Sequence, residues 1–353
     1  MSGHQTKQKA LLVTELGKPI KLVNDRPIPY PDTGEVQIRV TIAGISPHVQ
    51  KARDWGLFVK DSLPAVVTND VVGEVTAIGT GVTKYSLGDR VVYQARFQPP
   101  WTQGGLQQYA VLDVLHSAKI PDGISDDEAA TVPSNVMAPL LAIFAPSYLG
   151  IPAPWTPQAS TFDYAGTILL VLGGGSNCGK FGVQLAALAG IGRIVVVGGD
   201  EAELKSYGAT QVLNRHGSPE EVTSRIRDIV GDELLYAYDT VNFPATQHIG
   251  VNALSSTKKG KVARLLPLGP IDEAQVKPKK EGYEVIDVHG VSQNKPDLSV
   301  PFWERLPGYL EEKKIRPTSY TVIKGLSEEG VNGVLDAYRD EKKVVKTNIH
   351  VQD

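Results

Sequence analysis

A turn rich in glycine between two apolar segments is the part of the chain whose residue types most directly suggest chemistry. The apolar run from Ile168 to Leu172 predicts a buried strand, and the segment after the turn, as far as Leu188, predicts a helix. Glycines between them would let a pyrophosphate approach the backbone N–H groups and the positive end of the helix. A second strand follows, and Asp200 lies about 20 residues past the turn, where a carboxylate can bind a ribose. This order predicts a dinucleotide site whose turn consists of Gly173, Gly174, Gly175, Ser176, Asn177, Cys178 and Gly179.

The elements around this turn predict an α/β protein of two domains. Strands and helices alternate from residue 166 onward, which is typical of a doubly wound parallel sheet. The first 140 residues instead carry short β-branched runs separated by Gly, Pro and Asp turns, which indicates a compact barrel-like unit. The tail returns to mixed elements and closes with a strand from Lys346 to Val351. We therefore expect a β-rich domain of residues 1–145 with 285–353, and a dinucleotide-binding domain of residues 146–284.

Length and composition narrow the class of protein further. The 353 residues exceed one ordinary hydrophobic core. A net charge of −3 offers no basic surface for nucleic acid or an anionic membrane, and no apolar run approaches the about 20 residues of a membrane span. Cys178 is the only cysteine, and the first residues lack the apolar core of a signal peptide. We expect a cytoplasmic monomer or homodimer that binds a small molecule, with no nucleic acid and no membrane as partner.

Longer motifs add a resemblance to a known superfamily. Val72-Val-Gly-Glu-Val-Thr-Ala-Ile-Gly-Thr-Gly-Val-Thr83 precedes Leu87-Gly-Asp-Arg-Val-Val92, and the glycine turn precedes Gly182-Val-Gln-Leu-Ala186 and Leu204-Lys-Ser-Tyr-Gly-Ala209. With these motifs the chain resembles the medium-chain dehydrogenase/reductase superfamily, and most closely its zinc-independent quinone and enoyl reductases. The proline-rich loop before the glycine-turn strand is similar to that of the fungal trans-acting enoyl reductases of polyketide synthases. The resemblance implies a GroES-like catalytic domain and a Rossmann domain.

The resemblance also allows a comparison of metal ligands. Zinc-dependent members have a catalytic cysteine where this chain has Ser46, and a Gly-His-Glu triplet where it has Thr68, Asn69 and Asp70. Zinc prefers thiolate, imidazole and carboxylate ligands, and a four-cysteine structural site cannot be built from one cysteine. Asp70 and His48 could form only an incidental pair. We expect no metal.

Without a metal to polarise an alcohol or ketone, hydride chemistry favours a conjugated carbonyl. Hydride would add at the β-carbon, and the enolate oxygen would need a hydrogen-bond donor. The resemblance gives Lys51 the position of an active-site lysine of a fungal trans-acting enoyl reductase. His48 could donate or relay a proton, and Asn135 opens a helix that faces the cofactor in the family. Ser46 could bond the nicotinamide carboxamide.

Each of these candidates has an ordinary alternative. Most lysines are solvated, and a histidine near a turn is commonly bonded to backbone. Ser46 could be a turn hydroxyl, and Asn135 could serve only as a helix cap. The aromatic residues Trp55, Phe58, Phe97 and Trp101 form either an apolar substrate pocket or simple packing. A threonine of the fungal reductases corresponds to Ala138 here, which weakens a direct transfer of mechanism.

The residues near the expected adenosine end give conflicting indications of the cofactor. Asp200 favours NADH, because a carboxylate accepts hydrogen bonds from two ribose hydroxyls and repels a 2′-phosphate. Lys205 and Arg215 offer positive charge, although both could be solvated surface residues. The resembled reductases mostly use NADPH, and Gly198 and Gly199 leave room for the phosphate. We favour NADPH, with NADH as the alternative.

These observations predict an NADPH-dependent reductase of a carbon–carbon double bond conjugated to a carbonyl, working on a polyketide intermediate or a reactive enone. For a reductase of a polyketide intermediate, the expected macromolecular partner is a polyketide synthase. The first alternative is a quinone or carbonyl reductase. The second is a dinucleotide-binding partner protein that has lost catalysis, which the incomplete set of proton donors leaves open.

Overall fold

The computed structural model describes residues 6–241, 243–265 and 269–353, which form two compact units. The first unit contains the chain up to Ser134 together with Val291–Asn294 and Phe302–Asp353, and the second contains Asn135–Gly290 and Lys295–Pro301. The unit boundaries fall within the helices α3, Pro133–Phe144, and α8, Pro296–Glu311. The expected domain bounds, 1–145 with 285–353 and 146–284, stay a prediction.

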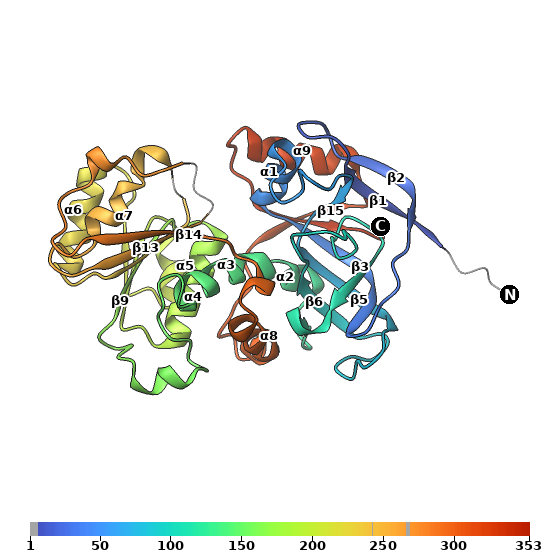
Figure 1. Cartoon of the computed structure of the whole chain (residues 1–353), viewed down its shortest axis with the longest axis horizontal. Helices are drawn as coiled ribbons and strands as arrows, with labels where there is room; N and C mark the ends of the chain where they lie inside the picture. Colours follow the sequence, from blue (N-terminus) through green and yellow to red (C-terminus); the bar gives the residue numbers. More distant parts are fainter. Residues whose placement is uncertain (1–5, 242, 266–268) are drawn as a thin grey trace. The chain divides into compact units, whose positions relative to one another are not determined.

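The first unit consists mainly of strands. A mixed sheet of seven strands has the order β15-β16-β3-β5-β6-β8, with β7 paired to β3, and a smaller sheet has the order β2-β1-β4. Three further helices, α1, α2 and α9, belong to this unit (Figure 1). The bounds are β1 Lys7–Val13, β2 Lys21–Pro27, β3 Glu35–Ile45, α1 Pro47–Trp55, β4 Ala65–Val66, β5 Asp70–Ile78, β6 Arg90–Gln94, β7 Tyr109–Asp113, β8 Ser117–Lys119, α2 Asp126–Ala130, β15 Tyr320–Lys324, α9 Glu328–Arg339 and β16 Lys346–His350.

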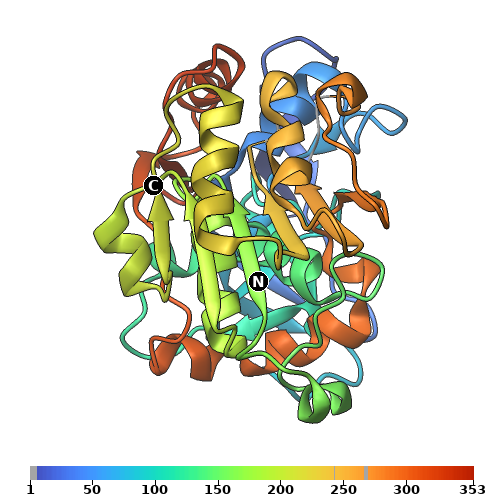
Figure 2. The same ribbon diagram turned by 90° about the vertical axis from the view of Figure 1, so that its left-hand side faces the viewer.

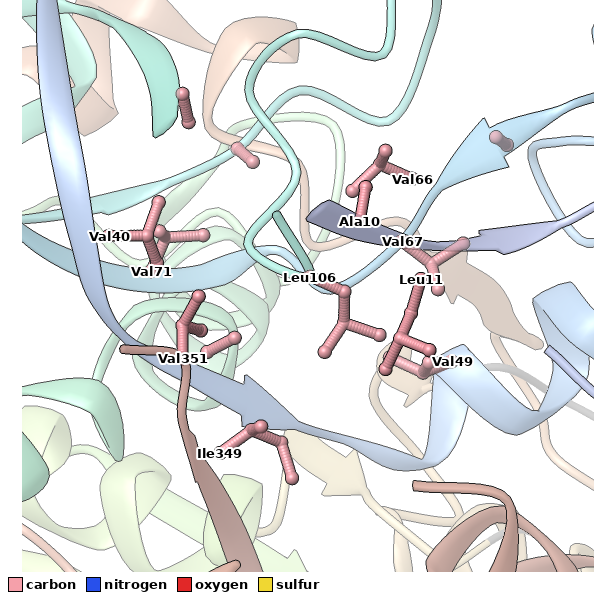
Figure 3. Close-up of a cluster of buried hydrophobic side chains, with 14 of the residues drawn as sticks. Ala10, Leu11, Val40, Val49, Val66, Val67, Val71, Leu106, Ile349 and Val351 are labelled. Carbon is pink, nitrogen blue, oxygen red and sulfur yellow. The ribbon is translucent and has the colours of Figure 1, made fainter. Parts of the chain in front are cut away.

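The core of this unit joins elements that are far apart in the sequence. Figure 3 shows buried side chains from β1, β3, β5 and β16 around a common centre, among them Leu11, Val40 and Ile349. Val49 of α1 belongs to the same cluster. Because Val49 is fully buried, it anchors α1, the helix that carries His48 and Lys51, to the sheet.

The second unit contains a six-stranded parallel sheet of order β11-β10-β9-β12-β13-β14. Helices α4 and α5 lie against one face, and α6 and α7 pack together against the other (Figures 1 and 2). This is the doubly wound arrangement, and the predicted fold class is confirmed. The bounds are β9 Ile168–Leu172, α4 Asn177–Ala189, β10 Arg193–Val197, α5 Glu201–Ser206, β11 Gln211–Leu213, α6 Pro219–Val230, β12 Tyr236–Asp239, α7 His248–Ala253, β13 Gly260–Leu265 and β14 Tyr283–Val288.

The edge strand β14 extends this sheet past residue 284. It pairs in parallel with β13 from the Gly260–Tyr283 pair to the Leu265–Val288 pair. Residues 285–288 therefore belong to the parallel sheet rather than to the β-rich unit. None of the described helices combines the length and the apolar character that a membrane crossing requires.

Candidate active site

The glycine turn connects β9 to α4 and is held by two hydroxyl groups. Ser176 caps α4, because its Oγ accepts a hydrogen bond from the Gly179 N–H at 2.9 Å. Ser176 Oγ also lies 2.8 Å from Thr240 Oγ1, and Thr240 Oγ1 donates to the Leu172 carbonyl at 2.9 Å. Gly173 has φ +91°, and a Cβ there would collide with Thr240 Oγ1. The turn is thus fixed from its own strand and from the segment after β12.

Two glycines of the turn differ in what a side chain would meet. A Cβ on Gly179 would collide with the Gly173 carbonyl oxygen, so the fold itself requires glycine there. A Cβ on Gly175 would be 3.5 Å from the nearest atom, the Gly199 Cα, and Gly175 is exposed. The fold therefore leaves Gly175 free to carry a side chain, and an open backbone beside a helix N-terminus fits a pyrophosphate. The residues of this turn fit a dinucleotide.

The residues near the end of β10 have the following contacts. Asp200 is exposed and caps α5, because its carboxylate accepts a hydrogen bond from the Glu203 N–H at 2.8 Å. Lys205 pairs with Glu201 on the surface at 2.7 Å. The aliphatic stem of Arg215 lies over Gly198, with its Cδ 3.1 Å from the position of a Cβ there. Among the described residues, the Arg215 guanidinium makes no ion pair, so it is the cation available to a phosphate.

His48 and Asn69 form a fixed pair in the first unit. His48 Nε2 lies 2.9 Å from Asn69 Oδ1, and the Asn69 amide nitrogen donates to the carbonyls of Ala95 at 2.9 Å and Arg96 at 3.2 Å. Because these two bonds orient the amide, its oxygen faces the ring and His48 must donate through Nε2–H. Neutral His48 then presents Nδ1 as an acceptor. Burial lowers the pKa of His48, opposed by Asp70 and assisted by Lys346 and Lys51, so the neutral ring predominates at pH 7.

Lys51 lies one helical turn after His48 on the same face of α1. It is half-buried, and its Nζ lies 5.9 Å from the centre of the Trp55 ring. Burial lowers the pKa of Lys51 below its usual value of 10.5. A partly desolvated ammonium of this kind can donate to a carbonyl oxygen while staying charged at neutral pH.

A buried ion pair lies beside the histidine. The carboxylate of Asp70 accepts hydrogen bonds from the Lys346 ammonium, from Ser46 Oγ at 2.8 Å and from the Ser134 N–H at 2.6 Å. Lys346 Nζ also donates to Ser46 Oγ at 2.8 Å. The side chains of Lys346 and Asp70 are 1% and 0% exposed. Burial alone would raise the pKa of Asp70, but the Lys346 ammonium holds it below its ordinary value.

This network limits what Ser46 can do. Its one proton goes to Asp70 and one lone pair accepts from Lys346, so toward a nicotinamide carboxamide Ser46 could only accept a hydrogen bond. The described residues contain no cluster of three or more His, Cys, Asp and Glu side chains that could hold a metal ion. The absence of a metal stays a prediction.

Three of the four predicted aromatic residues line one small cavity in the first unit. Phe58, Phe97 and Trp101 surround it together with His48 and Asn69, among others, and its volume of about 20 Å³ is enough for one water molecule. The Phe97 ring lies 4.9 Å from that of Phe58 and 5.3 Å from that of His48, between ring centres. Trp55 is not among the lining residues, and 62% of its surface is exposed.

Asn135 belongs to the second unit, where it is buried and its Oδ1 lies 3.8 Å from Cys178 Sγ. Cys178 and Asn177 form the first turn of α4. The candidates thus form two groups. His48, Lys51 and Ser46 lie together in the first unit, and Asn135 lies with the glycine turn in the second. The catalytic and cofactor-binding roles of all these residues stay predictions.

Three residues of these groups had no predicted role in the site. Lys346 and Asp70 form the buried pair, and Thr240 holds the glycine turn. Lys346 opens a short strand, Lys346–His350, in which Ile349 is the one aliphatic residue, so the sequence gives no local signal that this lysine is buried. Thr240 has no local signal either, because its partners are 64 to 68 residues away in the chain.

Comparisons with known proteins find a domain family that matches part of the chain, and relatives in fungi. Residues 32–122 match the alcohol dehydrogenase GroES-like domain. The dehydrogenase orsE of Emericella nidulans is 28% identical over 92% of this chain and 93% of its own. The dehydrogenase azaJ of Aspergillus niger is 33% identical, but the match spans only 53% of this chain and 55% of that protein. The trans-enoyl reductase gkaC of Penicillium citrinum is 25% identical over 98% of this chain and 99% of its own.

Solved structures agree on the fold of the whole chain. The CurK enoyl reductase has a TM-score of 0.76 at 18% identity, covering 98% of this chain and 100% of that chain. A mycobacterial protein solved with NADPH has a TM-score of 0.72 at 20% identity, covering 97% and 99%. The chain has the fold of these two proteins, and its residues 32–122 match the alcohol dehydrogenase GroES-like domain. The predicted resemblance is confirmed, while zinc independence stays a prediction.

Proposed function

We propose that the protein is a zinc-independent, NADPH-dependent reductase of a carbon–carbon double bond conjugated to a carbonyl. The observation that carries the proposal is the half-buried ammonium of Lys51, which lies on the same face of α1 as His48. His48 in turn lines a small aromatic cavity. A half-buried ammonium suits an oxygen on which negative charge develops. The names of the relatives support the proposal, since three of them are trans-enoyl reductases.

When bound, the dinucleotide supplies a hydride for the β-carbon of the substrate. Lys51 donates a hydrogen bond to the carbonyl oxygen and stabilises the enolate as its charge develops. Neutral His48 presents only an acceptor at Nδ1, so it orients a water molecule or another donor rather than giving up a proton itself. The α-carbon proton then comes from Lys51 or from a water that His48 orients.

The dinucleotide would lie along the glycine turn of the second unit. Gly175 admits the pyrophosphate, the start of α4 supplies N–H donors, and Arg215 binds the 2′-phosphate of NADPH. Asp200 keeps its hydrogen bond to the start of α5, so its carboxylate is partly occupied there. Asn135, Ser46 and Lys205 complete the proposed contacts. A bound NADPH in the mycobacterial structure supports this assignment by analogy of fold.

A second candidate function is favoured by the exposed ring beside Lys51. Trp55, which is 62% exposed, could stack on a flat quinone, and Lys51, whose Nζ lies 5.9 Å from the centre of that ring, could donate to a quinone oxygen as readily as to an enone. We propose a polyketide intermediate as the physiological substrate, met in the cytoplasm and delivered by a polyketide synthase. Monomers and homodimers are both compatible with that role.

The experiment compares linear enones, macrocyclic enones and quinones as acceptors, with NADPH and NADH as separate donors. We expect oxidation of NADPH with loss of the carbon–carbon double bond of at least one enone. Turnover of quinones alone would replace the proposal by its second candidate. Dinucleotide binding by calorimetry, without turnover of any acceptor, would instead identify a binding protein that has lost catalysis.

A further inference from the structure

The buried pair of Lys346 and Asp70 takes no part in the chemistry proposed above. Both side chains are almost completely removed from water, which is costly for two charges unless their remaining hydrogen-bonding groups find partners. Asp70 finds them in Ser46, Ser134 and Lys346, and a Cβ on Gly44 would lie only 2.9 Å from Lys346 Nζ. The chain therefore keeps a tightly enclosed ammonium next to the candidate site.

This pair connects four distant points of the first unit. Ser46 is the N-cap residue of α1, but its side chain makes no capping bond, because the hydroxyl is turned to Asp70 and Lys346. Asp70 opens β5, and the Ser134 N–H belongs to the start of α3. Lys346 opens β16. The first turn of α1, which carries His48, is thus tied to the ion pair rather than closed by its own cap.

The same pair acts on the histidine through space. Asp70 raises the pKa of His48 and Lys346 lowers it, so the two charges act on the ring in opposite directions. Lys51 faces the ring from the same helix, and Arg96 lines the same cavity. Asn69, which receives the His48 hydrogen bond, directly precedes Asp70 in the chain. Displacement of Asp70 would therefore move the partner of His48 as well.

We propose that Lys346 is a positioning residue of the candidate site: through Asp70 and Ser46 its ammonium fixes the start of α1 and Asn69, and so the orientation of His48 and Lys51. The catalytic part of this inference rests on the proposed reductase function. Its structural part concerns only His48 and its environment.

The test uses Lys346→Met, which keeps the length of the side chain and removes the charge, with Lys343→Met as the control at an exposed lysine nearby. One readout is kinetic, with an enone that the wild-type protein reduces. We expect kcat to fall about 10- to 100-fold in Lys346→Met, because His48 and Lys51 on α1 would no longer be held in their orientation. The KM for NADPH should change little, because the glycine turn belongs to the second unit and Lys346 to the first. Lys343→Met keeps wild-type kinetics.

The second readout does not require activity. The ¹⁵N shifts of the histidine ring report tautomer and protonation, and a His48→Gln variant identifies the signals of His48 among the seven histidines. We expect neutral His48 with the proton on Nε2 in the wild type, and a higher pKa of His48 in Lys346→Met because the uncompensated Asp70 carboxylate favours the charged ring. Asp70→Asn combined with Lys346→Met removes both charges and should return the pKa toward the wild-type value, while kcat stays low.

The two readouts separate the two proposals. Wild-type kcat and unchanged His48 signals in Lys346→Met would overturn the positioning role. If the single variant does not fold, wild-type kcat and wild-type His48 shifts in the double variant would overturn it instead. If the wild-type protein reduces no acceptor, the reductase function fails, and the shift of the His48 pKa still decides whether Lys346 acts on the histidine.

Discussion

The partial burial of Lys51 suits its ammonium to the proposed role of donating a hydrogen bond to the substrate carbonyl. A fully solvated lysine would be a poor donor to a weakly basic carbonyl oxygen, because water competes for the same oxygen. Partial burial on α1 beside the Trp55 ring lowers that competition, and burial also lowers the pKa of the ammonium below 10.5. The residue therefore combines an acidic N–H donor with limited solvation.

Replacement of this ammonium should affect turnover far more than cofactor binding. For Lys51→Ala we expect kcat/KM for the enone to fall about 10²- to 10⁴-fold, the usual range for a lost general acid. The wild-type kcat/KM should decline on the alkaline side, because the donor must be protonated and its pKa lies below 10.5, and the variant should lack this decline. Stopped-flow pH profiles and NADPH binding by fluorescence measure both effects.

The exposed Lys60 provides the control, since Lys60→Ala removes a lysine just after α1 that lies outside the cavity. An unchanged kcat/KM and pH profile in Lys51→Ala would remove this lysine from the mechanism.

We propose that the choice between NADPH and NADH depends on Arg215. Lys205 is already paired with Glu201, and Asp200 caps α5, which leaves the Arg215 guanidinium for a 2′-phosphate. For Arg215→Ala we predict an increase of about 10- to 100-fold in KM for NADPH, corresponding to one lost charged hydrogen-bonding group, with little change in KM for NADH. Lys205→Ala should raise the KM for NADPH less than Arg215→Ala does, because Glu201 already pairs with the Lys205 ammonium. Equal effects on both cofactors would mean that Arg215 does not read the phosphate.

At the scale of the element, the turn between β9 and α4 contains glycines that are needed for two different reasons, packing of the turn and access of a ligand to the backbone. Gly179 serves the packing of the turn, whereas Gly175 has space beside it and is exposed. We predict that Gly175→Val remains folded and binds NADPH at least about tenfold more weakly, which corresponds to about 1.4 kcal/mol. Thermal unfolding and calorimetric titration distinguish the two properties.

Gly179→Ala should behave in the opposite way. Its Cβ would meet the Gly173 carbonyl, so we predict a loss of about 1–3 kcal/mol in the free energy of unfolding, measured with urea. Normal NADPH affinity in Gly175→Val would show that the pyrophosphate does not approach the backbone at this turn.

The glycine turn could be predicted from the sequence because its signals are local. A buried strand, glycines and an amphipathic helix follow one another within 22 residues, from Ile168 to Ala189, and each has its own pattern. The alternation of strands and helices gave the parallel sheet for the same reason. The placement of His48 and Lys51 on one helix face also follows from their spacing of three.

The buried pair could not be predicted in this way. Asp70 and Lys346 are 276 residues apart in the chain, and no local pattern indicates that two strands will bring their first residues together. Thr240 and Ser176 meet for the same long-range reason. The place of β14 in the parallel sheet likewise follows from its pairing with β13 and not from a local pattern.

At the scale of the whole molecule, the residues proposed to act in the reaction belong to two compact units. The first unit has its own apolar core and provides the rigid support of α1, while the second has a separate core beneath the glycine turn. Proposed donors to the substrate, Lys51 and the His48 pair, come from the first unit, and proposed contacts to the dinucleotide come mainly from the second. A reductase needs both, because a hydride donor without a stabilised enolate gives slow transfer.

The most direct test of this account is deuteride transfer from 4-deuterated NADPH to an enone that the protein consumes, with mass and NMR analysis of the product. We expect the product to carry one deuterium at the β-carbon and a solvent-derived proton at the α-carbon. Deuterium on the carbonyl carbon, or no transfer although NADPH binds, would contradict the central claim that this protein reduces conjugated carbon–carbon double bonds.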